Sequence, residues 1–121
     1  MTNAQSNNEY KFDLEERTAK FGEDIIEFAK FLPINEITRP LITQLVKCGT
    51  SVGANYCEAD DAESRKDFKH KIGISKKEVR EAKHFLRMIT KVVPEKDTLA
   101  RKLWQEAREL NLIFNSIYQK L

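Results

Sequence analysis

A regular apolar repeat in the second half of the chain constrains the fold most strongly. Core-type residues recur there in alternating steps of four and three residues, which is the spacing of an amphipathic α-helix with one buried side. These positions are Phe68, Ile72, Ser75, Val79, Ala82, Leu86, Ile89 and Val93. Ser64 and Asp67 resemble a capping box at the start, and Pro94 is a stop signal at the end. We therefore predict a helix over residues 64–93.

Three other segments repeat the same spacing and predict three more helices, over about residues 12–32, 38–61 and 96–120. Pro33 ends the first, Thr38 can cap the second, and Asp97 or Thr98 can cap the last. Their expected core positions are Leu14, Phe21, Ile25, Phe28 and Leu32; Leu41, Leu45, Cys48, Val52 and Ala59; and Leu99, Leu103, Ala107, Leu110, Phe114, Ile117 and Leu121.

The length of 121 residues and the hydrophobic content of 40% predict a single domain, and the low count of 4 Gly and 3 Pro favours helices over sheets. Because the connections are short, neighbouring helices must run antiparallel. The predicted fold is all-α, an up-down-up-down antiparallel four-helix bundle over residues 12–121, preceded by a disordered polar tail over residues 1–11. With no membrane span and no secretion signal in the sequence, we expect a cytoplasmic protein.

Charge is distributed unevenly between the predicted helices. Residues 64–93 hold ten basic and three acidic side chains, whereas residues 9–32 and 33–63 each carry a net charge of −3. On a helical wheel, the basic residues of the third helix gather about 60° to 180° from its core stripe. We call them the basic flank: Lys66, Lys69, Lys76, Lys77, Arg80, Lys83, Arg87 and Lys91. Such a ladder can follow a phosphate backbone, but it can also be a solvated face, or be neutralised by the acidic first two helices within or between subunits.

The second predicted helix holds unusually small residues in its middle. Gly49 and Gly53 each cost up to about 1 kcal/mol relative to alanine, so close approach of another helix should offset that cost. The partner helix can belong to the same chain or to another subunit. Apolar residues outside the core stripes favour a second buried surface and hence a homo-oligomer. They are Phe31, Ile42, Val46, Trp104, Leu112 and Ile113.

The sequence carries no recognisable catalytic motif, so we expect no enzymatic activity, no cofactor and no metal. Cys48 and Cys57 lie on opposite sides of one helix, so we interpret both as reduced packing residues. A metal-binding cluster would have to use carboxylates of the second and third helices together with His84, yet the Glu-x-x-His pair typical of such bundles occurs only once. We favour a structural polar network made of Ser51, Asn55, Glu58, Glu78 and Glu81.

Two segments resemble a known family. Residues 51–59, SVGANYCEA, and residues 64–71, SRKDFKHK, continuing to Lys77, Glu78 and Glu81, are similar to the 23S rRNA intervening-sequence proteins. The family pattern falls on Ser51, Asn55, Glu58, Ser64, Asp67, Phe68, Lys77, Glu78 and Glu81. Where members often have an aromatic-Trp-Leu run, this chain has His84, Phe85 and Leu86.

The resemblance implies a four-helix bundle that assembles into a ring, commonly a pentamer, with no established enzymatic activity. A related branch, the accessory proteins of diversity-generating retroelements, is thought to bind nucleic acid and a reverse transcriptase through basic surfaces. We therefore expect an oligomer that binds RNA or DNA through the basic flank. The competing expectation is a protein-protein scaffold or structural oligomer that does not bind nucleic acid directly.

Overall fold

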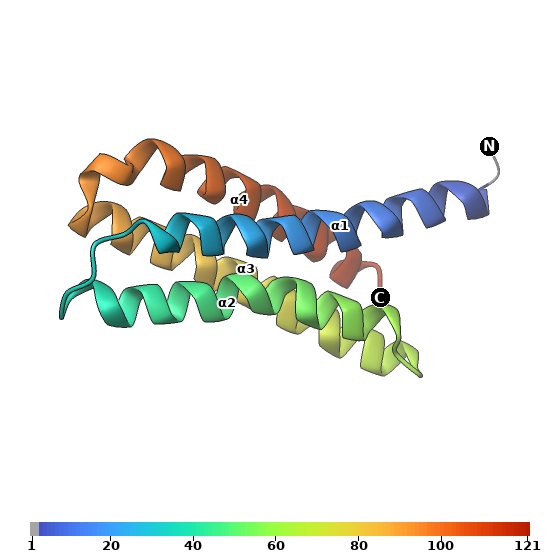
Figure 1. Ribbon diagram of the computed structural model, residues 1–121. Coiled ribbons are helices and arrows are strands. Elements are labelled where there is room, and N and C mark those ends of the chain that lie inside the picture. The colour runs from blue at the N-terminus through green and yellow to red at the C-terminus, as the bar shows by residue number, and fades with distance from the viewer. Residues whose placement is uncertain (1–2) are drawn as a thin grey trace.

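Four long helices make up the fold of this protein, shown as a computed structural model in Figure 1. The structure describes the backbone of residues 3–121 and the side chains of residues 14–121. The helices are α1 (Asn3–Lys30), α2 (Thr38–Asp60), α3 (Arg65–Val92) and α4 (Asp97–Gln119), with a single 3₁₀ turn, η1 (Pro94–Lys96), between α3 and α4. The described residues contain no strand, so the all-α prediction is confirmed.

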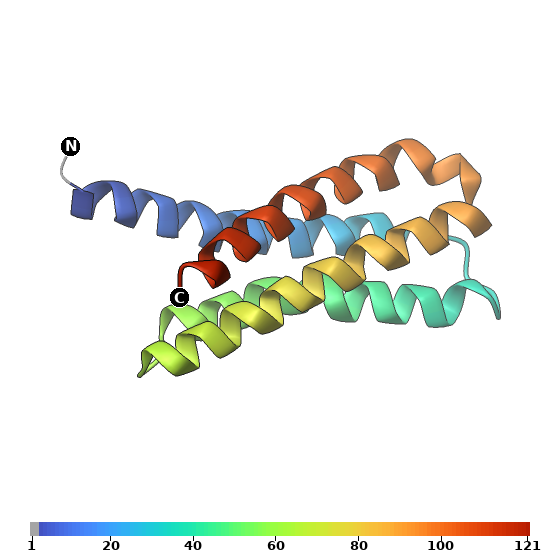
Figure 2. The same ribbon diagram turned by 180° about the vertical axis from the view of Figure 1, so that it is seen from behind.

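Consecutive helices run in opposite directions, as the two opposite views in Figures 1 and 2 show. Each helix packs against the next in the chain, and α4 closes the ring by packing against α1. The result is the predicted up-down-up-down bundle. The α1–α2 and α3–α4 connections lie together at one end, and the α2–α3 connection lies at the other.

The bounds of α2, α3 and α4 agree with the predicted ones to within one residue at each end, and residue 96, the predicted start of the last helix, belongs to η1. The first helix differs more, because α1 begins at Asn3 rather than near residue 12. The structure thus places residues 3–11 in a helix where the sequence predicted a tail, and residues 1–2 lie outside the described part. Residues 3–11 contain no Pro or Gly that would stop a helix, so backbone hydrogen bonding continues beyond the end of the bundle (Figure 1).

The predicted stripes supply most of the core. Of the third stripe, only Phe68 is half-buried, and the other seven residues are buried. Tyr56, Ala29 and Ala100 join the core as well. Leu99 is an exception, because it is 49% exposed. It lies near the start of α4, beside Phe31 in a groove between α1 and α4, where the two helices do not close over it.

The helix starts show which side chains cap them. Ser64 Oγ accepts a hydrogen bond from the Asp67 backbone N–H at 3.0 Å, which confirms the predicted cap of α3. The predicted cap at Thr38 is wrong, because its buried hydroxyl donates to the Pro33 carbonyl at 2.6 Å. Asn35 supplies the cap, with Oδ1 accepting from the N–H groups of residues 37 and 38. The start of α4 has no side-chain cap, and Asp97 binds Arg101 instead.

Small residues bring α1 and α2 close together, as the glycines predicted. A Cβ atom added at Gly49 would lie 2.9 Å from Ile25 Cγ1, and one at Gly53 would lie 3.3 Å from the Thr18 backbone. Gly22 of α1 also permits close approach of the two helices, since a Cβ atom added there would lie 3.4 Å from the Thr50 Cα. The partner of the two α2 glycines is therefore a helix of the same chain. Without side chains at these points, the backbones can approach to a distance that larger residues would prevent.

Candidate nucleic-acid interface

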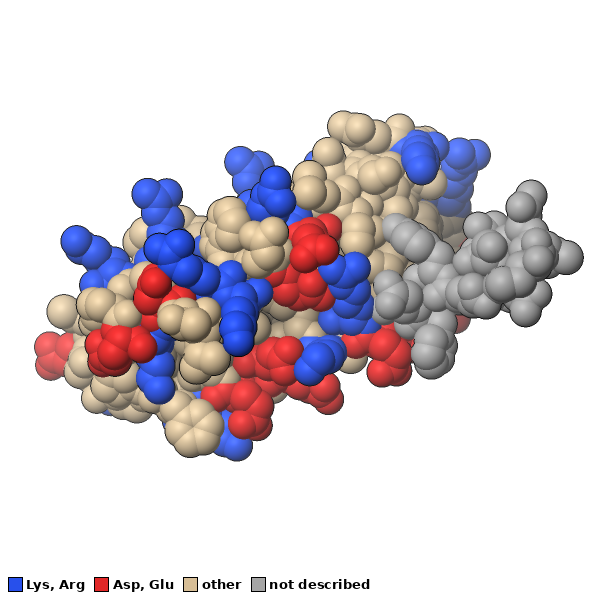
Figure 3. Space-filling view, turned by 90° about the horizontal axis from the view of Figure 1, so that it is seen from above, with Lys and Arg blue, Asp and Glu red and all other residues tan. Residues whose placement is uncertain are grey.

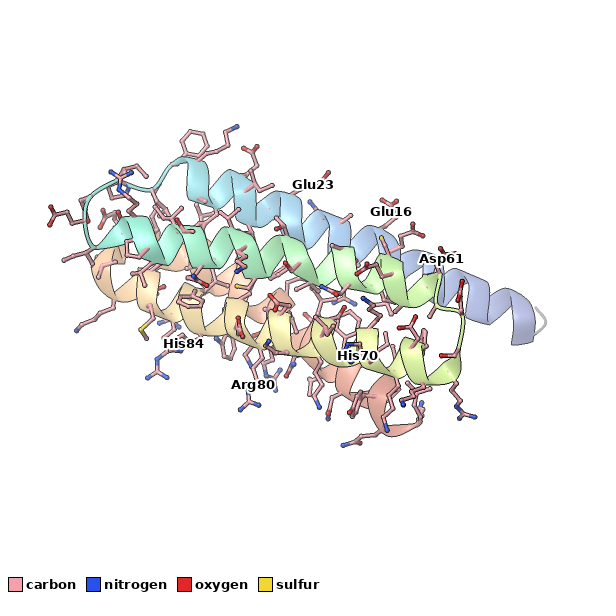
Figure 4. All side chains as sticks on the ribbon, turned by 90° about the horizontal axis from the view of Figure 1, so that it is seen from below. Glu16, Glu23, Asp61, His70, Arg80 and His84 are labelled. Carbon is pink, nitrogen blue, oxygen red and sulfur yellow. The ribbon has the colours of Figure 1, made fainter. Side chains whose placement is uncertain are left out.

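The basic flank lies on α3, on the side that faces α4 and on the adjoining outer surface. Figure 4 shows Arg80 and His84 projecting from α3 away from the bundle, on the side opposite Glu16 and Glu23 of α1. Five members of the flank are exposed, namely Lys66, Lys77, Arg80, Arg87 and Lys91, and three are half-buried, namely Lys69, Lys76 and Lys83. The eight side chains thus lie along one side of the helix.

Two aromatic rings of α4 hold the half-buried lysines in place. The Nζ atoms of Lys69 and Lys76 each lie 4.8 Å from the centre of the Tyr118 ring, and Lys83 Nζ lies 5.0 Å from the centre of the Trp104 ring. Contacts of this kind stabilise by about 0.5–1 kcal/mol at exposed sites. They arise because an aromatic ring is negative on its face, which attracts the ammonium group without neutralising its charge. The sequence reasoning missed Tyr118 and treated Trp104 only as an apolar residue outside the stripe.

Acidic side chains lie mainly away from this surface. Glu78 and Glu81 lie on the side of α3 near Cys48 of α2, although Glu81 shares a hollow with Lys77 and Arg80. Figure 3 shows most Asp and Glu toward the α1 side, where some Lys and Arg also lie, and Lys and Arg along the opposite edge. Glu106 and Glu109 of α4 turn toward α1, where Arg17 binds them. Among the described side chains, no ion pair joins a carboxylate to a member of the basic flank. No described carboxylate of α1 or α2 therefore forms an ion pair with the flank within one chain.

The Arg17 contact is the main polar link between α1 and α4. Its Nε atom donates to Glu106 Oε2 at 2.8 Å and its Nη2 atom to Glu106 Oε1 at 2.9 Å, a two-pronged geometry that suits a planar guanidinium. The hydrogen bonds and charge of Glu106 raise the pKa of Arg17 despite partial burial. The link turns two acidic residues of α4 toward α1 and away from α3.

The predicted polar network forms only in part between helices. Ser51 Oγ donates to the Lys47 carbonyl at 2.7 Å and Asn55 Nδ2 to the Ser51 carbonyl at 2.9 Å, both within α2. Glu58 does reach α3, where its Oε2 atom accepts from Lys71 Nζ at 3.4 Å. A further link that the sequence did not predict joins the buried Ser75 hydroxyl to the Val52 carbonyl at 3.0 Å. The network therefore bonds backbone carbonyls more than side chains.

Glu78 and Glu81 face the α2 side near the buried Cys48. Burial raises the pKa of Glu78, and the neighbouring Glu81 charge raises it further, although Lys77 and Lys47 oppose the shift. Burial and the same two carboxylates raise the pKa of the Cys48 thiol to about 12. Cys48 is thus the expected reduced packing residue, whereas Cys57 is free but exposed, so its interpretation as a packing residue is wrong.

The described residues show neither a metal cluster nor a membrane span. Across residues 14–121, no three His, Cys, Asp or Glu side chains are grouped so that they could hold a metal ion. None of the helices is long and apolar enough, over the described residues, to cross a membrane. The basic flank with its two aromatic supports is therefore the most distinctive chemical feature of the described surface.

The fold and this surface define an antiparallel four-helix bundle with one strongly basic side. Residues 11–116 match the family described as 23S rRNA-intervening sequence protein, so the chain belongs to that family. A solved structure of a protein of unknown function from the S23 ribosomal protein family of Bacteroides thetaiotaomicron is 29% identical, with a TM-score of 0.78. The alignment covers 87% of this chain and 97% of that one. No curated protein matches the sequence.

Proposed function

We propose that this protein is a non-enzymatic, oligomeric bundle that binds nucleic acid through the basic flank of α3. The observation that carries the proposal is the row of eight cationic side chains, five of them exposed, to which no described carboxylate is paired. An unpaired cationic surface is the electrostatic footprint of a protein that binds a phosphate backbone. The family's description, which refers to an insertion in ribosomal RNA, is compatible with a nucleic-acid partner.

The lysines over aromatic rings strengthen this proposal. A lysine that pairs with a carboxylate must lose that partner before it can bind a phosphate, whereas a lysine on a ring keeps its full charge. The rings also restrict the rotamers of Lys69, Lys76 and Lys83 before any ligand arrives, so less side-chain entropy is lost on binding. The flank is therefore partly preorganised for a polyanion.

The test is a charge-reversal variant with a matched control. We expect Lys76→Glu, Arg80→Glu, Lys83→Glu and Arg87→Glu together to abolish retention of RNA and DNA in a low-salt shift assay. The control reverses Lys20 and Lys30 of α1 and Arg39 and Lys47 of α2, which are all exposed, so both variants have the same net charge. Each lost phosphate contact reduces the slope of log K against log salt concentration by about 0.9. Any residual binding by the first variant should therefore depend less on salt.

Two results would contradict the proposal. Unchanged retention by the flank variant would show that α3 is not the binding surface. Equal loss in the control variant would show that net charge, rather than position, governs retention. Circular dichroism of both variants checks that the helices remain folded.

A second candidate function is a protein-protein scaffold without direct nucleic-acid binding. Exposed apolar side chains at the end of the bundle that holds the α1–α2 connection favour it, since Phe31 is 68%, Ile37 64% and Ile34 57% exposed. Of the apolar residues outside the stripes, Leu112 is also exposed, whereas Ile42, Val46 and Ile113 are half-buried in the chain itself. Exposed apolar clusters mark association surfaces.

Light scattering separates this candidate from the first. If the apolar end holds an assembly together, Phe31→Ser with Ile37→Ser should lower the molar mass, while Leu112→Ser should leave it unchanged. If the acidic helices of one subunit instead cover α3 of the next, the flank variant described above should break the assembly. A monomeric wild-type protein would contradict the scaffold and the oligomeric part of the first proposal.

A further inference from the structure

A pocket opens between α3 and α4 next to the basic flank. Its volume is about 380 Å³, within the range of about 300–1,000 Å³ that small-ligand sites occupy. Most of the pocket surface is apolar, but charged and polar side chains also line it. The lining residues are Leu86, Arg87, Thr90, Asp97, Ala100, Arg101 and Trp104. The pocket therefore offers an aromatic ring, an apolar floor and cationic groups in one place.

Charge around the pocket favours an anionic ligand. Arg87 belongs to the basic flank and lines the pocket, whereas Lys83 Nζ lies over the Trp104 ring but does not line the pocket. The acidic residue of the lining is Asp97, whose Oδ2 atom accepts a hydrogen bond from Arg101 Nε at 2.8 Å. Its charge is therefore balanced inside the pocket, and the surrounding surface stays positive.

Trp104 is the unusual member of the lining. It is the single tryptophan of the chain, and 36% of its surface is exposed, although most of a tryptophan is normally buried in a core or an interface. An exposed aromatic ring beside cationic side chains is the arrangement by which proteins hold unpaired bases, because the ring stacks on the base while the cations bind the phosphates. A duplex does not offer such a base, since its bases are stacked inside the helix.

We propose that this pocket binds an unpaired nucleobase stacked on Trp104, so that the protein prefers single-stranded over double-stranded nucleic acid. The inference rests on the proposed function and deepens it by naming the class of substrate. The basic flank supplies phosphate contacts that do not depend on strandedness. Trp104 supplies the contact to the base.

The fluorescence of Trp104 tests the inference in the wild-type protein, where no other tryptophan contributes to the signal. We compare a single-stranded oligonucleotide, the duplex of the same sequence and an abasic strand of the same length. Quenching by the single strand, with none by the duplex or the abasic strand, is expected. Binding of all three without quenching by any would overturn the inference but leave the proposed function standing. A failure of all three to bind would overturn both.

A pair of variants tests the energetic contribution. Trp104→Ala removes the ring on which the base would stack. We therefore expect it to weaken single-strand binding about 5- to 140-fold, the range that alanine substitution of stacking aromatic residues produces. Duplex binding should weaken far less, because for a duplex the ring contributes only by ordering Lys83. Leu112→Ala, which removes another exposed apolar side chain from α4, is the matched control and should change neither. Trp104→Phe should retain most of the single-strand affinity, and equal losses for single strand and duplex in Trp104→Ala would contradict the inference.

A second copy of this chain is the other occupant that such a pocket could take. In that case acrylamide would fail to quench Trp104 in the free protein at concentrations where it is assembled. Efficient acrylamide quenching that the single strand then suppresses is the result expected from the inference. Protection without nucleic acid would overturn it.

Discussion

Gly49 gives the sharpest test of the α1–α2 packing. A Cβ atom at this position would lie 2.9, 3.0 and 3.2 Å from Cγ1, Cγ2 and Cβ of Ile25. Ile25 is fully buried and β-branched, so neither γ carbon is the free end of a flexible side chain. Overpacking of this kind costs about 1–3 kcal/mol, whereas replacing a mid-helix glycine by alanine returns about 1 kcal/mol of helix propensity.

Gly73 is the matched control for Gly49→Ala. It also lies in the middle of a helix, but its added Cβ would approach only the Tyr118 ring edge, at 3.3 Å, and that half-buried ring can shift. Both Gly→Ala variants gain the same helix propensity, so this gain cancels when their stabilities are compared. We expect Gly49→Ala to be less stable than Gly73→Ala by about 1–3 kcal/mol in urea unfolding followed by circular dichroism at one protein concentration.

A double variant shows whether Ile25 is the cause. Ile25→Ala removes both γ carbons and should itself cost about 2–5 kcal/mol through the cavity that it leaves. In that background Gly49→Ala should cost much less, because the two closest contacts are gone, only the Cβ contact at 3.2 Å remains, and the propensity gain persists. Equal stability of Gly49→Ala and Gly73→Ala, or the same cost of Gly49→Ala in both backgrounds, would refute the reasoning about helix approach.

The two cysteines and Glu78 give three further predictions. Iodoacetamide should modify Cys57 but not Cys48 in the folded protein, as read by mass spectrometry, and Cys57→Ser should abolish the modification. Because the folded pKa of Cys48 is raised from 9.0 to about 12, this thiol contributes stability below pH 9.0 that is lost as pH rises to about 12, and Cys48→Ala should lack that loss. The raised pKa of Glu78 likewise means that its contribution is present below about pH 4.5 and is lost as pH rises through its folded pKa. Glu78→Gln should therefore flatten that part of the pH-stability curve, and an unchanged curve would contradict the shift.

Periodicity was enough to predict the helices, since an apolar residue every three or four positions requires a helix with one buried side. Strong end signals fixed the limits of α3, where Ser64 accepts the Asp67 N–H and Pro94 follows the last turn. The same reasoning was wrong at the start of α1, where residues 3–11 have neither an apolar stripe nor a helix breaker. It was also wrong at Thr38, because its hydroxyl is drawn to the Pro33 carbonyl, which a one-dimensional pattern does not place nearby.

The sequence alone determined the fold class and the membership of the basic flank, because both depend on spacing along one helix and spacing is local. Tertiary structure decided which side chains surround the basic flank. Only the antiparallel register of α3 and α4 brings Tyr118 beneath Lys69 and Lys76, and Trp104 beneath Lys83. Only the packing of the four helices turns two carboxylates of α4 toward Arg17, and no ion pair joins the flank to a carboxylate among the described side chains. These contacts join residues more than twenty positions apart, and their geometry is set by how whole helices pack rather than by any local pattern.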